Sequence, residues 1–421
     1  MPIERLCVFD QGLGCWTGHW VNFNDNIRLE AARRGLDYVA YGNAKIDGSV
    51  LGDLPVRPLF SHLPWTDLSG DSDVDYEKRG DAILADLLPT IDSLSSRDLL
   101  LFPTLTSQEI GGILRFGVEA WRQRGAIPVL LAQSTEGINI TAGPEANSTT
   151  KYFRRALSQL DSPAAFDCFV LLASSAELSV QYSAAFGRPV EPLCMPTTSA
   201  DETATSLSAA HHCVPPSPLR IGYFGHSSFA KGGHLLNEIV ETILERHPNA
   251  EFILHINKNP ETSEILKVFD VDRPRIFCLR GHITREEYYR QLQRCDIALL
   301  PYDRAKYGAT PSSVLSEALV AGKIVVGPEN TWIAREVWRT NAGATLFGDF
   351  NAASIIEALS RAIDQSKKLN ILARAASEQM RRSQNVQGFM DGLLAAVRDA
   401  GEPDRRRYGW KSPVAQHWHL T

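Results

Sequence analysis

A short segment near the middle of the chain has the residue types of a phosphate-binding turn. It reads YFGHSSFAKGG over 223–233 and follows the apolar run 219–224. Glycines let a phosphate approach the backbone closely, and a lysine ammonium neutralises its charge. The GxxxxGK(S/T) spacing of the P-loop is absent. We predict an anion-binding turn built from Gly225, His226, Ser228 and Lys231; the alternative for Lys231 is a solvated surface lysine.

A second segment, 307–319, places hydroxyl groups at the start of an expected helix. Pro311 suits the first turn of that helix, which should end near Gly322. The backbone N–H groups and the hydroxyls of Thr310, Ser312 and Ser313 would then lie at the positive helix end, which favours a diphosphate. Glu317 lies more than one turn further in, where its carboxylate could accept both hydroxyls of a ribose. The alternative is an exposed glutamate on an ordinary helix.

The turn that follows the first apolar run is rich in glycine. Gly12, Gly14 and Gly18 precede His19. The last interval is one residue too long for the GxGxxG pattern of dinucleotide-binding folds. We predict that this turn forms one wall of a ligand-binding cleft; the alternative is a tight turn that packs Trp16 and caps a helix.

Short apolar runs alternate with helical patterns along the chain. Continuous apolar strands of this kind are typical of a parallel sheet covered by helices on both faces. In the first half, residues 24–26 offer a helix cap, the helix should end at Gly35, and another helix should span about 107–124. The expected strands are 6–9, 38–41, 98–102, 127–131, 168–172 and 190–193, then 219–224, 251–256, 276–279, 296–300 and 323–326.

These series predict an α/β fold with two Rossmann-like doubly wound domains that face each other across a cleft. Ligands of such open sheets bind outside the carboxyl ends of the strands. The expected domains are 1–200 and 219–385, with a linker rich in Ser, Thr, Ala and Pro at 201–218. A C-terminal helix and tail, 386–421, is expected to pack back on the first domain.

Composition excludes several classes of protein. The 421 residues carry 43 Lys and Arg against 49 Asp and Glu, so a nucleic-acid partner is not expected. No apolar run approaches the roughly 18 residues of a membrane span, and the first residues have no signal-peptide pattern. The seven cysteines are odd in number and lack CxxC spacing, which indicates buried reduced thiols and a cytoplasmic protein. A peripheral contact with a membrane stays open.

Three segments of the second half, taken together and in their order along the chain, resemble the donor-binding domain of the family-4 type glycosyltransferases of GT-B fold. The resemblance covers about 219–340, and the first half resembles the family more loosely through 18–19, the helix to Gly35 and 169–196. The matching segments are GH at 225–226 with KG at 231–232, CDIALLPY at 295–302, and SSVLSEALVAGKIVV at 312–326.

The resemblance implies a donor site for a nucleotide sugar. Lys231 would bind the diphosphate and Glu317 the nucleotide ribose, while the amides and hydroxyls around Ser312 and Ser313 would bind the distal phosphate. Gly281, in the loop 280–283, would lie by the base. Enzymes of this family usually need no metal, and no cofactor is expected.

The resemblance also implies transfer of the sugar, with retention, to a glycan, a lipid-linked glycan or a small molecule. Gly14, Gly18 and His19 would then lie on the acceptor side. The catalytic residue is not identified by the sequence. His19 is the nearest candidate, and it could equally be a structural hydrogen-bonding residue.

Two positions depart from the family pattern. The family often has two glutamates eight positions apart; Glu317 matches the second, but the first position is Ala309. An arginine usually accompanies the lysine, and the aligned position is Ser228. These departures favour one alternative, a degenerate GT-B protein that binds nucleotide or a partner without transferring sugar. A nicotinamide-dependent oxidoreductase is a second alternative, which the missing GxGxxG disfavours.

Overall fold

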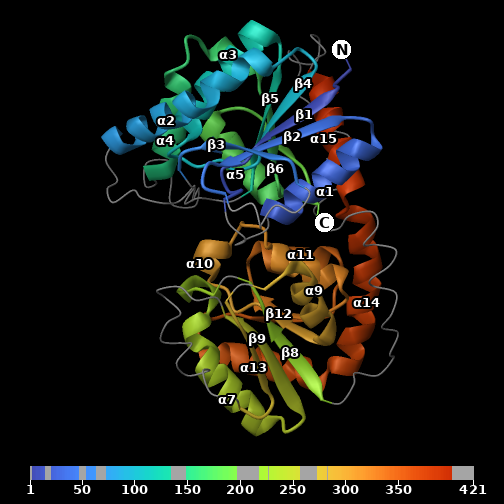
Figure 1. The fold of residues 1–421 in the computed structure, drawn as a ribbon. Coiled ribbons are helices and arrows are strands. Elements are labelled where there is room, and N and C mark those ends of the chain that lie inside the picture. The colour runs from blue at the N-terminus through green and yellow to red at the C-terminus, as the bar shows by residue number, and fades with distance from the viewer. Residues whose placement is uncertain are drawn as a thin grey trace. The chain divides into compact units, whose positions relative to one another are not determined.

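The computed structural model describes residues 2–14, 20–46, 54–62, 73–133, 148–196, 218–225, 227–256, 273–281 and 283–400. Within these residues the chain forms two compact units (Figure 1). Unit 1 comprises Met1–Pro196 and Val386–Thr421, and unit 2 comprises Thr197–Asn385. Each unit is built around one parallel β-sheet.

The sheet of unit 1 has seven strands in the order β3-β2-β1-β4-β5-β6-β7, all parallel. The chain builds one side of the sheet from β1 to β3 and then the other side from β4 onward. This doubly wound order has its switch point between β1 and β4. The strands are β1 (Arg5–Phe9), β2 (Asp37–Asn43), β3 (Val56–Phe60), β4 (Asp98–Phe102), β5 (Ile127–Ala132), β6 (Val170–Ala173) and β7 (Glu191–Pro192).

Helices cover both faces of this sheet because successive side chains of its strands point to opposite faces. In β1, Cys7 and Phe9 belong to one buried cluster, and Leu6 and Val8 belong to the other. The first cluster includes residues of α2 (Asp73–Leu87), α3 (Ile110–Arg124), α4 (Ser148–Ser158) and α5 (Ala176–Phe186), with the short helices η2 (Leu88–Ser93) and η4 (Pro163–Cys168). The second includes α1 (Trp20–Arg33) and α15 (Val386–Ala400).

Helix α15 completes unit 1 from the far end of the described chain. Figure 1 shows it beside α1. The ring of Phe389 meets that of Phe23 edge to face, with ring centroids 5.7 Å apart. Arg34 Nη1 and Asp391 Oδ1 form an ion pair at 2.7 Å. One core of unit 1 therefore combines side chains from both ends of the chain.

The sheet of unit 2 has six parallel strands in the order β10-β9-β8-β11-β12-β13, with its switch point between β8 and β11. One face packs against α7 (Leu236–Arg246) and α13 (Ala352–Asp364), and the other packs against α11 (Ser313–Val320) and α12 (Trp332–Arg339), while α14 (Ser366–Ser383) contributes side chains to both clusters. The strands are β8 (Leu219–Tyr223), β9 (Ala250–Ile256), β10 (Ile276–Arg280), β11 (Ile297–Leu299), β12 (Ile324–Pro328) and β13 (Ala344–Phe347).

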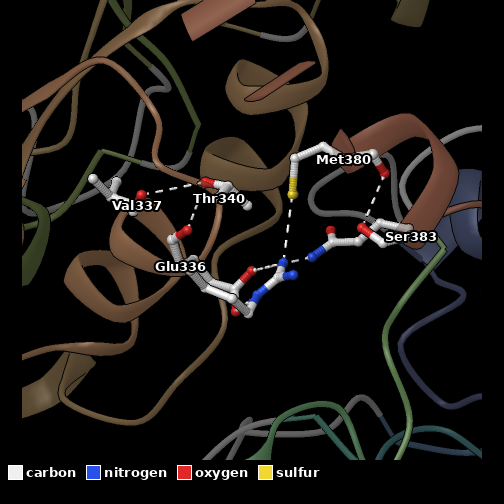
Figure 2. Close-up of polar contacts among 7 residues, drawn as sticks. Glu336, Val337, Thr340, Met380 and Ser383 are labelled. Atoms are coloured by element: carbon white, nitrogen blue, oxygen red, sulfur yellow. Dashed lines mark hydrogen bonds and ion pairs between the residues drawn. The ribbon is translucent and has the colours of Figure 1, made fainter. Parts of the chain in front are cut away.

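A buried polar cluster fixes the end of α14 against α12 (Figure 2). Glu336 is only 5% exposed, and Arg339 donates to its carboxylate at 2.6 and 3.1 Å. Gln384 Nε2, just beyond α14, donates to the same carboxylate at 3.4 Å, and Arg339 Nη2 lies 3.6 Å from Met380 Sδ. Unit 2 ends one residue later, at Asn385, so the chain leaves this unit from an anchored helix end.

The predicted sheets are confirmed, and the differences lie in details. The edge strands β3 and β13 were not predicted. In β3, Arg57 and Pro58 interrupt the apolar pattern, and β13 has only four residues. The predicted cap at 24–26 is wrong, since these residues lie inside α1. Pro311 lies before the N-cap residue Ser312 and not in the first turn of α11. The strand expected at 168–172 begins at Val170, after η4.

None of the five cysteines that the structure describes belongs to a disulfide. Cys7, Cys168 and Cys295 are buried, and Cys194 and Cys278 are half-buried. Burial raises the pKa of Cys7 to about 12, so this thiol is inert at neutral pH. Among the described helices none has the length and apolarity to cross a membrane. Most of the predicted linker, 201–217, lies outside the described residues.

The crossing of α2 and α3 gives a test of this packing. A Cβ on Gly112 would lie 2.2 Å from the carbonyl oxygen of Gly80, whereas one on Gly111 would meet Gln159 Oε1 at 3.7 Å, an ordinary contact. We expect Gly112→Ala to lower the stability of unit 1 by about 1–3 kcal/mol, because the helices must separate. Thermal unfolding followed by circular dichroism measures this loss.

Gly111→Ala is the matched control on the same helix. It should be neutral or stabilising by up to about 1 kcal/mol, because alanine has the higher helix propensity. Equal melting temperatures for the two variants would contradict the close helix crossing.

Candidate functional site

The candidate site of unit 2 lies where its strands end. Gly225 follows β8, Gly281 follows β10, and the segment 300–312 follows β11. In a parallel sheet these carboxyl ends share one edge, and the edge next to the switch point is where ligands bind in such folds. Gly225 and Gly281 have positive φ angles of 96° and 72°, so both turns use a backbone conformation that favours glycine.

Lys231 lies in a short turn, η5 (Phe229–Lys231), that packs against the chain after β11. Asp303 N donates to Ala230 O at 2.8 Å. A Cβ on Gly232 would lie 2.4 Å from Pro301 O, so only glycine allows this approach. The turn that carries the lysine is therefore fixed to the neighbouring loop.

The Lys231 ammonium lies over two aromatic rings. Its Nζ is 5.2 Å from the ring centroid of Tyr302 and 5.9 Å from that of Tyr307. Burial lowers the pKa of Lys231. Among the described residues, no carboxylate forms an ion pair with this ammonium. Lys231 is half-buried, so it is not the fully solvated surface lysine of the alternative, and a cation held by ring faces retains its attraction for an anion.

Gly225 lies between this lysine and the start of α11. A Cβ at Gly225 would be 3.7 Å from Lys231 Nζ and 3.1 Å from Val314 Cγ2, in the first turn of α11. Ser312 caps that helix, because its hydroxyl oxygen accepts from Leu315 N at 3.3 Å. The structure thus brings Gly225, Lys231 and the predicted helix end together.

The remaining predicted residues of this turn have different surroundings. Thr310 is half-buried and Ser313 is exposed at the start of α11. Ser228 holds the turn through its carbonyl oxygen, which accepts from Lys231 N and Gly233 N at 3.1 and 3.0 Å. Gly281 N donates to Ile256 O at 3.2 Å. His226 lies outside the described residues.

Glu317 is half-buried and is held from another helix, which begins directly after the turn at Gly281. Tyr288 and Tyr289, both on α9 (Arg285–Arg294), donate their hydroxyls to the two carboxylate oxygens, and the Tyr289 bond is 3.4 Å long. The alternative of an ordinary exposed glutamate is therefore wrong. The two tyrosines cannot be identified from the sequence, since no spacing rule connects residues that are 28 and 29 positions apart.

The predicted acceptor-side residues belong to unit 1 and are mostly not described. Gly18 and His19 lie outside the described residues. Gly14 is half-buried, and its N–H donates to Gly12 O at 2.8 Å. A Cβ on Gly12 would lie 2.5 Å from the indole of Trp20, so this turn packs closely on the start of α1. The structure thus describes a tight turn at Gly12–Gly14.

Unit 1 contains a buried acid that the sequence analysis did not single out. Asp10 follows β1 at the switch point and is fully buried. Its carboxyl accepts from Gly12 N at 3.0 Å, Asn24 Nδ2 at 2.8 Å and Thr104 Oγ1 at 3.0 Å. Burial raises the pKa of Asp10 to about 6, although these three donors favour the ionised form. The feature of the sequence that could have identified Asp10 is its position directly after an apolar strand.

A second buried acid, Glu109, precedes the first residue of α3 on the chain after β4. It is also fully buried, and the Thr106 hydroxyl donates to its carboxyl. Burial raises the pKa of Glu109 to about 7, while the Thr106 hydroxyl and the positive charge of Arg79 lower it. Perturbed acids next to a switch point mark this edge of unit 1 as a second candidate functional region. Within the described part of the chain, no three His, Cys, Asp or Glu side chains are grouped to hold a metal ion.

Comparisons with known proteins identify the fold. No family model matches the chain, and no curated protein matches it in sequence. The structure of HepE from Anabaena in complex with UDP-glucose is 15% identical, with a TM-score of 0.60, over 94% of this chain and 99% of that one. Sucrose-phosphate synthase from Thermosynechococcus elongatus is 12% identical, with a TM-score of 0.65, over 95% and 100%.

A glycosyltransferase from Rickettsia africae is 9% identical, with a TM-score of 0.63, over 96% of this chain and 99% of that one. Identities this low show the fold alone. The likeness confirms the predicted fold class, two Rossmann-like doubly wound domains of the GT-B type.

The buried carboxyl of Glu109 predicts a pH dependence of stability. Its pKa is about 7 in the folded protein against 4.5 for an exposed glutamate, so the folded state retains a proton that the unfolded state loses. The free energy of unfolding should therefore fall as pH rises from about 4.5 to 7, by on the order of 2–3 kcal/mol for this group. Glu109→Gln removes this titration. The melting temperature of the variant minus that of wild type should therefore rise between pH 5 and 8, because only wild type loses stability through this group.

Glu119→Gln makes the same substitution at a partly exposed position of the same helix and controls for the effect of the substitution itself. If the melting temperature of Glu109→Gln relative to wild type stays flat between pH 5 and 8, Glu109 does not titrate as its burial indicates.

Proposed function

We propose that this protein is a glycosyltransferase that uses a nucleotide sugar as its donor. The observation that carries the proposal is the convergence of Lys231, Gly225 and the start of α11 at one edge of the unit 2 sheet. A half-buried ammonium next to a helix N-terminus suits a diphosphate, and a glycine lets the phosphates approach the backbone. HepE, whose fold this chain shares, has been solved with UDP-glucose and with UDP, which supports a donor of this class.

In the proposed reaction, the bond between the sugar C1 and the diphosphate oxygen breaks, and C1 forms a bond to an acceptor hydroxyl oxygen. The nucleoside diphosphate leaves with the electron pair of the broken bond, and the proton of the acceptor hydroxyl passes to the leaving diphosphate or to water. Lys231 and the N-terminal end of α11 stabilise the negative charge that develops on the leaving diphosphate. We propose that no metal is needed for this, because a cation and a helix end already face the same group.

The finer features of the proposal rest on the resemblance to the family-4 type enzymes. They are retention of configuration at C1 and a glycan, a lipid-linked glycan or a small molecule as acceptor. Lys231, Ser312 and Ser313 bind the diphosphate, and Glu317 binds the ribose. The reaction takes place in the cytoplasm, a reducing compartment in which free thiols such as Cys7 persist.

A second candidate function is binding of a nucleotide without transfer. It is favoured by Ala309, which is buried where the family often has a carboxylate, and by Ser228, which holds the turn with its carbonyl where the family usually has an arginine. Release of nucleoside diphosphate from UDP-glucose and other nucleotide sugars, measured with and without glycan acceptors, separates the two. Binding without release would support the second candidate.

Lys231→Ala tests the donor site directly. We expect the affinity for UDP, measured by calorimetry, to fall by about 1.5–3 kcal/mol, the usual cost of losing a hydrogen bond to a charged group. Lys306→Ala, an exposed lysine on α10 (Arg304–Tyr307), removes the same charge nearby and should change the affinity by no more than about 0.5 kcal/mol. Equal affinities of wild type and Lys231→Ala for UDP, GDP and ADP would exclude a diphosphate site at Lys231.

A further inference from the structure

The carboxylate of Glu317 is oriented by side chains from a neighbouring helix. Tyr288 donates its hydroxyl to Glu317 Oε2, and Tyr289 donates to Oε1 at 3.4 Å. Glu317 lies on α11 and both tyrosines lie on α9, so these bonds connect two helices across about 28 residues of sequence. A glutamate side chain has several rotatable bonds, and the hydrogen bonds from the two tyrosines select one of its orientations.

Tyr288 is itself fixed by aromatic packing. Its ring meets the buried ring of Phe224 edge to face, with centroids 5.5 Å apart, and that of Tyr289 at 5.4 Å. Phe224 is the residue immediately before Gly225, in the phosphate-binding turn. Burial and the charge of Glu317 raise the pKa of Tyr288 well above that of an exposed tyrosine, so its hydroxyl remains a donor.

We propose that Tyr288 is a positioning residue for recognition of the donor nucleoside: it holds the Glu317 carboxylate in the orientation that accepts the ribose hydroxyls. This inference rests on the proposed function. A carboxylate has about four lone-pair positions, so acceptance from tyrosine hydroxyls is compatible with acceptance from a ribose diol. Tyr289, with its longer bond, contributes less.

The position of α9 gives this arrangement a further consequence. The helix begins at Arg285, and its cap Thr284 accepts from Glu287 N at 3.2 Å. The loop before it contains Gly281, beside which the base is proposed to lie. Glu317 is thus tied to the element that follows the base loop, so the ribose contact and the base loop are held by one helix.

A different role is structural: the tyrosines would only fasten α9 to α11. The two roles differ in what the change Tyr288→Phe does. This variant keeps the ring and its packing on Phe224 and removes only the hydroxyl. A structural role predicts lower stability and an equal effect on every ligand, whereas a positioning role predicts a selective loss of ribose recognition.

The experiment compares a ribose with a 2′-deoxyribose ligand. A thermal-shift screen of UDP, GDP and ADP first selects the nucleoside diphosphate that stabilises wild type most. Calorimetric titrations of wild type, Tyr288→Phe and Tyr289→Phe then use that ligand, its 2′-deoxy form and inorganic pyrophosphate. For wild type we expect the ribose form to bind at least about tenfold more tightly than the deoxy form, since the 2′-hydroxyl donates to a carboxylate.

In Tyr288→Phe we expect this preference to fall severalfold toward one, with the affinity for pyrophosphate unchanged. Tyr289→Phe should retain most of the preference. If Tyr288→Phe prefers the ribose ligand as strongly as wild type does, the inference is overturned and the proposed donor site is unaffected. An equal loss of affinity for all three ligands also overturns the inference, because it indicates a structural role for Tyr288. If wild type binds none of the nucleoside diphosphates, the proposed function fails, and the inference fails with it.

Discussion

Parallel strand pairing is the constraint on which both units depend. It places the carboxyl ends of all strands of a sheet at one edge, so residues far apart in sequence become neighbours there. In unit 1 the Asp10 carboxyl after β1 accepts from the Thr104 hydroxyl after β4, 94 positions later. In unit 2 the Lys231 ammonium after β8 lies over the Tyr302 ring after β11. Both contacts cross a switch point, where the loops diverge and the edge is open.

Buried charge is the second determinant, because an ionised group removed from water needs compensation. The structure supplies it in three ways. Asp10 has three donors and Glu109 has a hydroxyl, yet burial still raises the pKa of both. Glu317 has tyrosine hydroxyls, and Lys231 has the faces of two rings. Among the described residues, neither Asp10 nor Lys231 forms an ion pair, which keeps both available for a polar ligand or a proton.

The sequence was sufficient for the fold class and for placing Gly225 and Lys231 in one turn after a strand, because apolar runs and glycines act locally. Gly225 and Lys231 were identified from their place after a strand, and the structure puts them side by side. Contacts that depend on packing between distant helices were not accessible. Nothing in the residues 285–294 indicates that Tyr288 meets Glu317, and nothing in Asp10 alone indicates its burial. Short edge strands such as β13 were missed because only one side of them is paired, so their sequences are less strongly apolar.

The place of α15 in unit 1 affects how this protein can be made. During synthesis the strands β1 to β7 emerge from the ribosome first, but the face formed by Leu6, Val8 and their neighbours is completed by Phe389 and Met390 of α15. The roughly 190 intervening residues take on the order of 10–40 s to translate at typical rates. During that time unit 2 can form its own core, while the nascent unit 1 exposes an apolar face. The usual order, in which the N-terminal part of a chain folds first, is thus reversed for the last step in the folding of unit 1.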